Sequence, residues 1–191
     1  MAIKTNELFP EGIKEGFFRI KKEDKIFKTI KKQALFLERS KLEDDEDYQQ
    51  LIPQIVLKVG KKIFIHKIAQ KGNESRLHDL FPIFLGGHVD EGDLSIEEAA
   101  DREFNEEIEY KGKIIKKEFQ GLVKLHDNEV DRVHTGLVWI YEGDGLLWKH
   151  RKDECLVDGK FVLISDLDKY KEKMTYWSRI FLPELKKLVD G

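Results

Sequence analysis

The chain has 191 residues, of which 37% are charged and 40% are hydrophobic, and its 34 basic and 37 acidic residues leave a formal net charge of −3. That length suits one domain of ordinary size better than two. Because the charges nearly cancel, the composition gives no overall attraction to nucleic acid or to an anionic membrane, so local groups must hold any anionic ligand.

The first 50 residues mix basic and apolar positions without a long regular pattern. We expect them to form an N-terminal extension of short strands and turns that packs on a main domain spanning residues 51–191. An acidic run, Glu43–Asp47, lies near the end of the extension. Runs of like charge usually face solvent, so we expect a solvated turn or the start of a helix there.

Two runs rich in β-forming residues follow, Gln54–Val59 and Lys62–Ile68. The glycine-containing dipeptide between them predicts a β-hairpin. A polar, turn-like segment over residues 71–80 comes next, and Phe81–Leu85 then leads to a pair of glycines.

Residues Ile96–Tyr110 contain neither Gly nor Pro and predict a helix, which Ser95 and Glu98 would cap reciprocally. Three further strands are expected over Ile114–Leu125, Val133–Tyr141 and Lys160–Ile164. A closing helix is expected over Thr175–Val189, where Pro183 should kink the helix or start a new one. This order of elements predicts an α/β fold in which helices cover the faces of a mixed sheet.

The central helix carries acidic residues on its apolar side. At about 100° per residue, one broad arc collects five apolar side chains. They are Ile96, Ala99, Ala100, Phe104 and Ile108. Glu103 and Glu107 fall inside this arc and Glu106 falls at its edge, so three carboxylates stack on one side. Glu97 points the same way but lies in the first turn, where the helix dipole favours an acid. The side expected to face solvent carries Glu98, Asp101, Asn105 and Glu109.

Three half-buried carboxylates repel one another and lose hydration, so their clustering should require a counter-charge. Arg102 is one available cation, but a single guanidinium does not neutralise three acids. A divalent cation does, and all-oxygen ligation suits Mg²⁺ or Mn²⁺. The alternative is an ordinary glutamate-rich surface helix with salt bridges between successive turns, and helix geometry alone leaves both interpretations open.

Glycines precede this helix. Gly86 and Gly87 end a β-rich run, and Gly92 lies just before the helix. Glycines at such places permit tight turns and a close approach of the backbone to a ligand. A carbonyl oxygen from the turn would complete a metal site beside the carboxylates, and a loop that feeds a helix N-terminus can also hold phosphate oxygens.

The stretch from Gly87 to Glu107 resembles the signature of the Nudix (MutT-like) family, Gly-x5-Glu-x7-Arg-Glu-U-x-Glu-Glu-x-Gly-U, in which U is a bulky apolar residue. The leading glycine is matched by Gly87, and the central Arg-Glu-U-x-Glu-Glu is matched by residues 102–107. Upstream, the lead of Gln49–Pro53 into the hairpin is similar to a bacterial subgroup described as predicted MutT-family phosphoesterases.

Three departures from the signature concern the loop and the end of the helix. Asp93, a shorter carboxylate, stands for the first glutamate, and eight residues instead of seven separate it from Arg102. Glu109 and Tyr110 stand for the final glycine and apolar residue, so a few more residues should stay helical. None of the three touches the carboxylates of the expected metal site.

The resemblance implies a Nudix α/β/α sandwich that hydrolyses a diphosphate linking a nucleoside to another moiety. It also implies Mg²⁺ or Mn²⁺ as cofactor and a small-molecule nucleotide or diphosphate as partner, without specific nucleic-acid binding. Homodimers are common in the family, so a homodimer is a candidate assembly. In this resemblance Arg102 orients the glutamates, and the metal ligands are Gly87, Glu103, Glu106 and Glu107.

The attacking water needs a general base. Family members differ in which glutamate serves, and Glu103 is the first candidate here. Glu129, in a polar loop expected over residues 127–131, is the second candidate, although a plain solvent-facing role is the stronger interpretation for it. Glu154 is the third.

Three residues are candidates for substrate binding. Arg76 is a candidate to meet a phosphate, and His88 is a candidate by its location after Gly87. Tyr141 is a candidate to stack on a base, although an aromatic residue in a strand more often belongs to the core.

The alternative function is a Nudix-fold module that binds or senses a nucleotide without hydrolysing it, which a slightly degenerate signature would fit. Against it, all three metal-holding glutamates are present, and no helix-turn-helix segment is recognisable. A third interpretation, an isopentenyl-diphosphate isomerase, requires a catalytic cysteine in a context that Cys155 does not provide.

Cys155 is the single cysteine, so no internal disulfide can form and a reducing compartment is expected. Met1–Phe9 lacks the basic-then-apolar layout of a signal peptide, and no apolar run has the length of a membrane span. We therefore expect a cytoplasmic protein without a membrane partner, in which Cys155 is a bystander.

Overall fold

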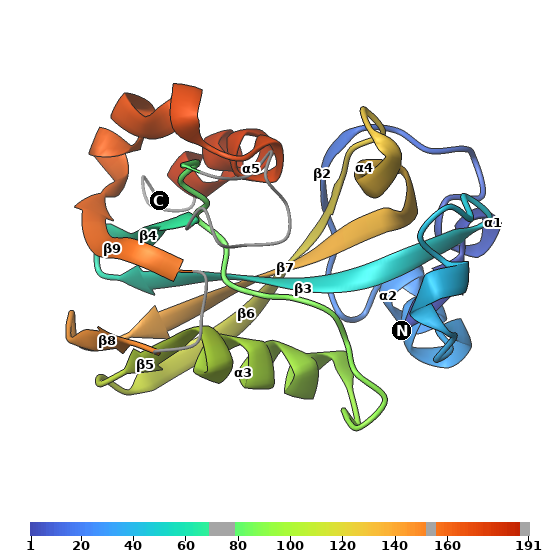
Figure 1. Ribbon diagram of the computed structural model, residues 1–191, viewed down its shortest axis with the longest axis horizontal. Coiled ribbons are helices and arrows are strands. Elements are labelled where there is room, and N and C mark those ends of the chain that lie inside the picture. The colour runs from blue at the N-terminus through green and yellow to red at the C-terminus, as the bar shows by residue number, and fades with distance from the viewer. Residues whose placement is uncertain (69–78, 152–155, 188–191) are drawn as a thin grey trace. The chain divides into compact units, whose positions relative to one another are not determined.

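The computed structural model describes residues 1–68, 79–151 and 156–187. Within these ranges the chain forms a seven-stranded sheet, a two-stranded sheet and the helices that flank them (Figure 1). The expected α/β fold with a mixed sheet is therefore confirmed.

The strands are β1 (Ala2–Lys4), β2 (Gly16–Arg19), β3 (Tyr48–Val59), β4 (Lys62–Ile68), β5 (Ile108–Tyr110), β6 (Ile114–Lys124), β7 (His134–Gly143), β8 (Trp148–His150) and β9 (Leu156–Leu163). The α-helices are α1 (Thr5–Leu8), α2 (Lys25–Gln33), α3 (Ile96–Glu107), α4 (Glu129–Val133) and α5 (Tyr176–Lys187). The 3-10 helices are η1 (Arg39–Lys41) and η3 (Ile164–Lys173). The large sheet has the order β2-β6-β7-β3-β4-β9, and β1 pairs with β3 outside this path.

The chain divides into two compact units. The division falls within β3, β6, β7 and α3, so each of these elements has residues in both units. The first unit comprises residues 1–54, 87–101 and 119–139. In it, β1 pairs with β3 and β2 pairs with β6, both antiparallel. The amphipathic α2 buries Phe27, whose ring packs on Phe119, and Phe119 packs in turn on Trp139. The first 50 residues thus add strands to the sheet, and a domain boundary at residue 50 stays a prediction.

The second unit comprises residues 55–86, 102–118 and 140–191. In it, β4 pairs with both β3 and β9, and β5 pairs with β8, all antiparallel. The C-terminal η3 and α5 contact each other, and α5 buries Phe181 against Phe84 with ring centroids 5.6 Å apart. The Ser178 hydroxyl of α5 accepts the Ile83 N–H at 3.1 Å. These two contacts anchor the segment that runs into Gly86.

Most elements expected from the pattern are present. The hairpin is confirmed as β3 and β4, although β3 already begins at Tyr48. Strands occur where three more were expected, but β9 begins at Leu156, earlier than predicted. The acidic run Glu43–Asp47 forms a largely exposed turn, as expected.

The helix predicted over Ile96–Tyr110 is too long. It ends at Glu107, and the next three residues form β5 instead. Ile108 is fully buried, and the Tyr110 hydroxyl donates to the Gly145 carbonyl oxygen at 2.7 Å. These tertiary contacts outweigh local helix propensity. The expectation that Glu109 would prolong the helix is therefore wrong, and this residue lies in a strand.

Two further segments differ from expectation. The polar segment around Glu129, expected as a loop, contains α4, whose Asn128 side chain accepts the Asp131 N–H at 3.0 Å. The closing helix α5 continues through Pro183 as one helix, so Pro183 does not start a new one. Of the helices in the described ranges, none is both long and apolar enough to span a membrane.

Candidate active site

The helix α3 buries the arc that its sequence predicts. All five apolar residues of the arc are at most 4% exposed: Ile96, Ala99, Ala100, Phe104 and Ile108. The acids beside them differ in exposure: the Glu103 side chain is 15% exposed, and that of Glu106 is 54% exposed. Glu107 is half-buried. Carboxylates therefore do reach into the buried side of the helix.

Arg102 bridges two of these carboxylates. One guanidinium nitrogen, Nη1, lies 2.9 Å from Glu103 Oε1 and 2.9 Å from Glu106 Oε2. Charge-assisted contacts of this length fix both side chains and offset part of their repulsion. The Arg102 side chain is itself only 25% exposed, which reduces screening by solvent.

The third carboxylate is held by the backbone. Glu107 Oε2 accepts the N–H of Gly86 at 3.1 Å, which ties the end of α3 to the segment before Gly87. Gly86 has a φ of +148°, a conformation that side chains rarely adopt. The first glycine of the pair is therefore required by the turn that presents its N–H to the carboxylate.

Asp93 braces the loop ahead of α3. It is only 8% exposed, and its Oδ2 accepts the Asp90 N–H at 2.8 Å, while its own N–H donates to the Asp90 carbonyl oxygen. The helix start has the expected capping pattern, because Ser95 Oγ accepts the Glu98 N–H at 3.1 Å. Glu98 reaches back to the Leu94 N–H at 2.8 Å, one residue before the Ser95 N–H that reciprocal capping would use. The shortened acid thus has a structural role within this loop.

His88 contacts His134 within the first unit. Their Nε2 atoms are 3.3 Å apart, and His134 Nδ1 donates to the Val130 carbonyl oxygen at 2.7 Å. Burial, assisted by the positive charge of Arg39, lowers the pKa of His88 to about 4. The His88 imidazole is therefore neutral at physiological pH and takes part in hydrogen bonds without carrying charge.

The remaining predicted residues are not all available for contact. Tyr141 is 2% exposed, with its ring 5.4 Å from that of Phe104 and the Lys117 ammonium 5.0 Å from its ring centroid, so it is a core residue of the second unit. Glu129 is exposed at the start of α4. Arg76, Glu154 and Cys155 lie outside the described residues.

The donor set of α3 fits a hard divalent cation by its chemistry. Three carboxylates on one side of a helix provide only oxygen ligands, which Mg²⁺ and Mn²⁺ prefer. Within the described ranges, no three acidic, histidine or cysteine side chains already converge as a metal cluster. Glu103 and Glu106 are turned to Arg102, and Glu107 is turned to Gly86. Metal binding would therefore exchange some of these contacts for metal–oxygen bonds.

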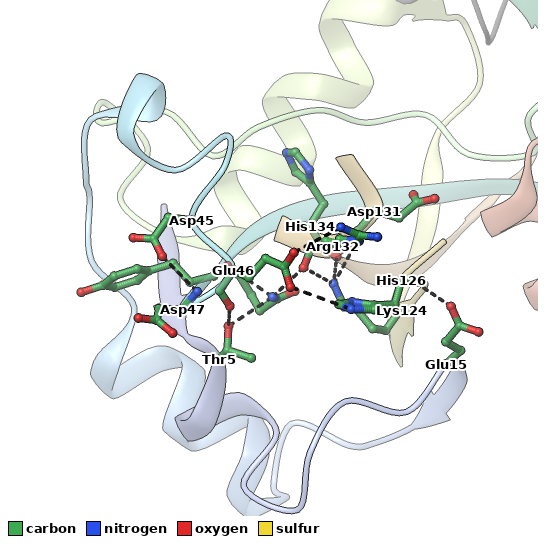
Figure 2. A network of polar contacts seen from close by, with 12 residues as sticks. Thr5, Glu15, Asp45, Glu46, Asp47, Lys124, His126, Asp131, Arg132 and His134 are labelled. Carbon is green, nitrogen blue, oxygen red and sulfur yellow. Dashed lines mark hydrogen bonds and ion pairs between the residues drawn. The ribbon is translucent and has the colours of Figure 1, made fainter. Parts of the chain in front are cut away.

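Sequence reasoning missed a group of buried polar residues near α4, part of which is drawn in Figure 2. Lys124, Gln49 and Thr135 are each 0% exposed. A signal for Lys124 existed, because it interrupts the otherwise apolar run Leu122–Leu125 near the end of a strand. A lysine in such a run is buried only when its ammonium finds partners.

A family model described as the NUDIX domain matches residues 55–185, which is more than half of the chain. The chain belongs to the Nudix family. The matched range contains Arg102 and the glutamates of α3, so the predicted family resemblance is confirmed. Nudix hydrolases in general use divalent metal ions.

Solved and curated Nudix relatives agree with this assignment. The crystal structure of Tm1382, provisionally described as a Nudix hydrolase, has a TM-score of 0.82 and 30% identity and covers 98% of this chain and 97% of its own. The NUDIX domain of Shewanella oneidensis NrtR, solved with ADP ribose, has a TM-score of 0.60 at 14% identity, covers 74% and 88%, and shows the fold alone. Protein YmaB of Bacillus subtilis (strain 168) is 27% identical over 152 residues, 75% of this chain and 74% of YmaB. Family and neighbours together support a Nudix hydrolase.

Proposed function

We propose that the protein is a Mg²⁺- or Mn²⁺-dependent hydrolase that cleaves a diphosphate linkage in a nucleoside diphosphate derivative or a related phosphoanhydride. The observation that carries this proposal is the set of three carboxylates on α3, two of them paired with Arg102 and the third held by the Gly86 N–H. Nudix membership supports the reaction class, and the all-oxygen donor set supports the class of cation.

In this proposal the metal ligands are Glu103, Glu106, Glu107 and the backbone oxygen of Gly87. Arg102 orients the first two carboxylates, which its 2.9 Å contacts to both support. When bound, the cation offsets negative charge on the phosphates and on the leaving group.

Glu103 is the first candidate for the general base. Its carboxylate is the less exposed of the two that Arg102 holds, so a water that it orients is shielded from bulk solvent. The oxygen of that water forms a bond to phosphorus, the bond from phosphorus to the leaving phosphate oxygen breaks, and Glu103 takes the proton. Glu129 is the second candidate.

ADP-ribose is the first compound to test, because the NUDIX domain of NrtR was solved with it. His88 is the first candidate for a ligand contact, since it follows Gly87 directly and its neutral imidazole can donate or accept a hydrogen bond. Tyr141 could stack on a base only after leaving its packing on Phe104. Arg76 stays a proposed phosphate contact.

The test is hydrolysis of a panel of phosphoanhydrides by the purified protein. The panel contains ADP-ribose, other nucleoside diphosphate sugars, dinucleoside polyphosphates and nucleoside triphosphates, each with Mg²⁺, with Mn²⁺ or with EDTA. Chromatography of the products measures turnover. We expect turnover of at least one compound with Mg²⁺ or Mn²⁺, and loss of that turnover in EDTA.

The alternative, a binding module without hydrolysis, gives a different result in the same panel. It predicts no turnover of any compound, and calorimetric binding of a nucleotide that is equally tight with and without Mg²⁺. That combination would overturn the proposed function.

A further inference from the structure

Lys124 places an ammonium group inside the first unit. It lies at the end of β6 and is 0% exposed. Its Nζ donates to three backbone carbonyl oxygens, at 2.6 Å to Asp131, 2.8 Å to Arg132 and 2.9 Å to His134 (Figure 2). The three protons of an ammonium thus each have an acceptor, and all three acceptors belong to the end of α4 and the start of β7.

Burying this cation is costly. Burial lowers the pKa of the Lys124 ammonium to about 8, although nearby carboxylates act in the opposite direction. Those carboxylates are Asp131, Glu46 and Glu15. A methionine would fill nearly the same volume without this cost, but it would leave three carbonyl oxygens without their donor. The lysine therefore fixes the positions of these carbonyl groups, which an apolar side chain would not do.

A side chain of β3 also holds the end of α4 and the start of β7. Gln49 of β3, also fully buried, donates from Nε2 to the Arg132 carbonyl oxygen at 2.9 Å. Its Oε1 accepts the Thr135 hydroxyl at 2.9 Å. Buried polar contacts from two strands converge on the segment 131–135, and such fully satisfied networks specify one backbone position.

The segment 131–135 places the His134 imidazole against the loop that begins at Gly87. A carbonyl oxygen only accepts, so His134 Nδ1 carries a hydrogen that it donates to the Val130 carbonyl oxygen, and this bond orients the ring. Its Nε2 faces Nε2 of His88 at 3.3 Å. His88 directly follows Gly87, the leading glycine of the Nudix signature. A chain of contacts therefore runs from the Lys124 ammonium to this loop.

We propose that Lys124 is a positioning residue, whose buried ammonium holds the start of β7 so that His134 meets His88. This inference rests on the proposed function in one respect, since the loop that carries His88 is taken to be the one that serves substrate and metal. The positional claim itself stands on the contacts of the first unit alone.

The test compares Lys124→Met with Lys124→Arg and with a matched control. The control is Lys116→Met, because Lys116 lies on the same strand but is 59% exposed and pairs with Glu118 at the surface. The first readout is the tautomer of His134, measured at pH 7 by long-range ¹H–¹⁵N correlation of the imidazole nitrogens. We expect the Nδ1–H form in the wild type, the control and Lys124→Arg, and mixed tautomers in Lys124→Met.

The second readout is hydrolysis of the fastest compound of the panel in Mg²⁺. Lys124→Met should raise KM by about tenfold with a smaller change in kcat, because a displaced binding contact weakens substrate binding more than the chemical step. If the wild type hydrolyses nothing, the proposed function fails while the tautomer readout still decides the role of Lys124. A folded Lys124→Met with the wild-type tautomer of His134 would overturn the inference.

Should the variant not fold, the wild type can be tested by titrating Lys124 in place. The carboxylates that act on its charge are those of Glu15, Glu46 and Asp131. The Arg132 guanidinium and the His126 imidazole both lie next to Glu46. None of these types ordinarily titrates between pH 7.5 and 9.5, and burial lowers the pKa of the Met1 α-amino group, whose charge also acts on His88. We expect the His134 signals to change with a midpoint near pH 8, and signals that stay constant over this range would overturn the inference.

Discussion

At the scale of single residues, Glu107 is held differently from the other carboxylates of α3. Arg102 divides its contacts between Glu103 and Glu106, whereas Glu107 accepts the N–H of Gly86. A neutral amide oxygen can accept the same hydrogen bond. The charge of Glu107 can therefore be removed without removing the contact that orients its side chain.

This difference leads to a prediction for Glu107→Gln. Its turnover in Mg²⁺ should fall by about a hundredfold or more, because the cation loses an anionic ligand, while the unfolding midpoint changes little. The control is Glu109→Gln in β5, whose carboxylate pairs with Lys111 at the surface and should leave turnover unchanged. Steady-state kinetics beside thermal unfolding check both, and near-normal turnover of Glu107→Gln would remove the residue from the site.

At the scale of elements, β2 joins the sheet at a point where β6 has a glycine. Gly121 has a φ of +147° and pairs in register with Arg19. A Cβ atom built on Gly121 would overlap the carbonyl oxygen of Phe18 in β2. The close approach of β2 to β6 therefore depends on the absence of a side chain at this position.

We predict that Gly121→Ala lowers the free energy of unfolding by about 2 to 4 kcal/mol, through an unfavourable φ and a clash with backbone. Urea unfolding followed by circular dichroism measures this change. Gly92→Ala is the matched control, since a Cβ there meets nothing within 4 Å. Equal midpoints for the two variants would show that β2 does not pack on β6 in this way.

At the scale of the whole molecule, a cation bound by the folded chain alone stabilises it against unfolding. With Mg²⁺ at ten times its Kd, the free energy of unfolding should rise by about 1.4 kcal/mol. For a chain of this size the midpoint should rise by about 3 to 6 °C. Differential scanning calorimetry in Mg²⁺ and in EDTA measures the shift.

The control for this shift is the double variant Glu103→Gln/Glu107→Gln, which removes two of the proposed ligands. It should unfold at the same temperature with and without Mg²⁺. A shift as large as that of the wild type would mean that Mg²⁺ binds elsewhere on the protein.

Helix periodicity is local, and this is why so much of α3 could be predicted. The spacing of Ala99, Phe104 and Ile108 identifies the buried side, and the same spacing places Glu103 and Glu107 beside it. The order of glycine loop, helix and Arg-Glu-x-x-Glu-Glu also pointed to the Nudix family, which the family match confirms. Hairpin and strand patterns were readable for the same reason, since alternation with a period of two is set by neighbouring residues.

From the sequence alone, then, follow the α/β class, the family and the side of α3 that carries the carboxylates. Tertiary structure decided the rest, because it depends on segments far apart in the chain. The helix ends at Glu107 because β8 offers a partner to the next three residues. Lys124 is buried because carbonyl groups of the segment 131–134 accept its three protons. Neither pairing is marked by a periodic pattern in the sequence, because each contact forms only when both segments are in place.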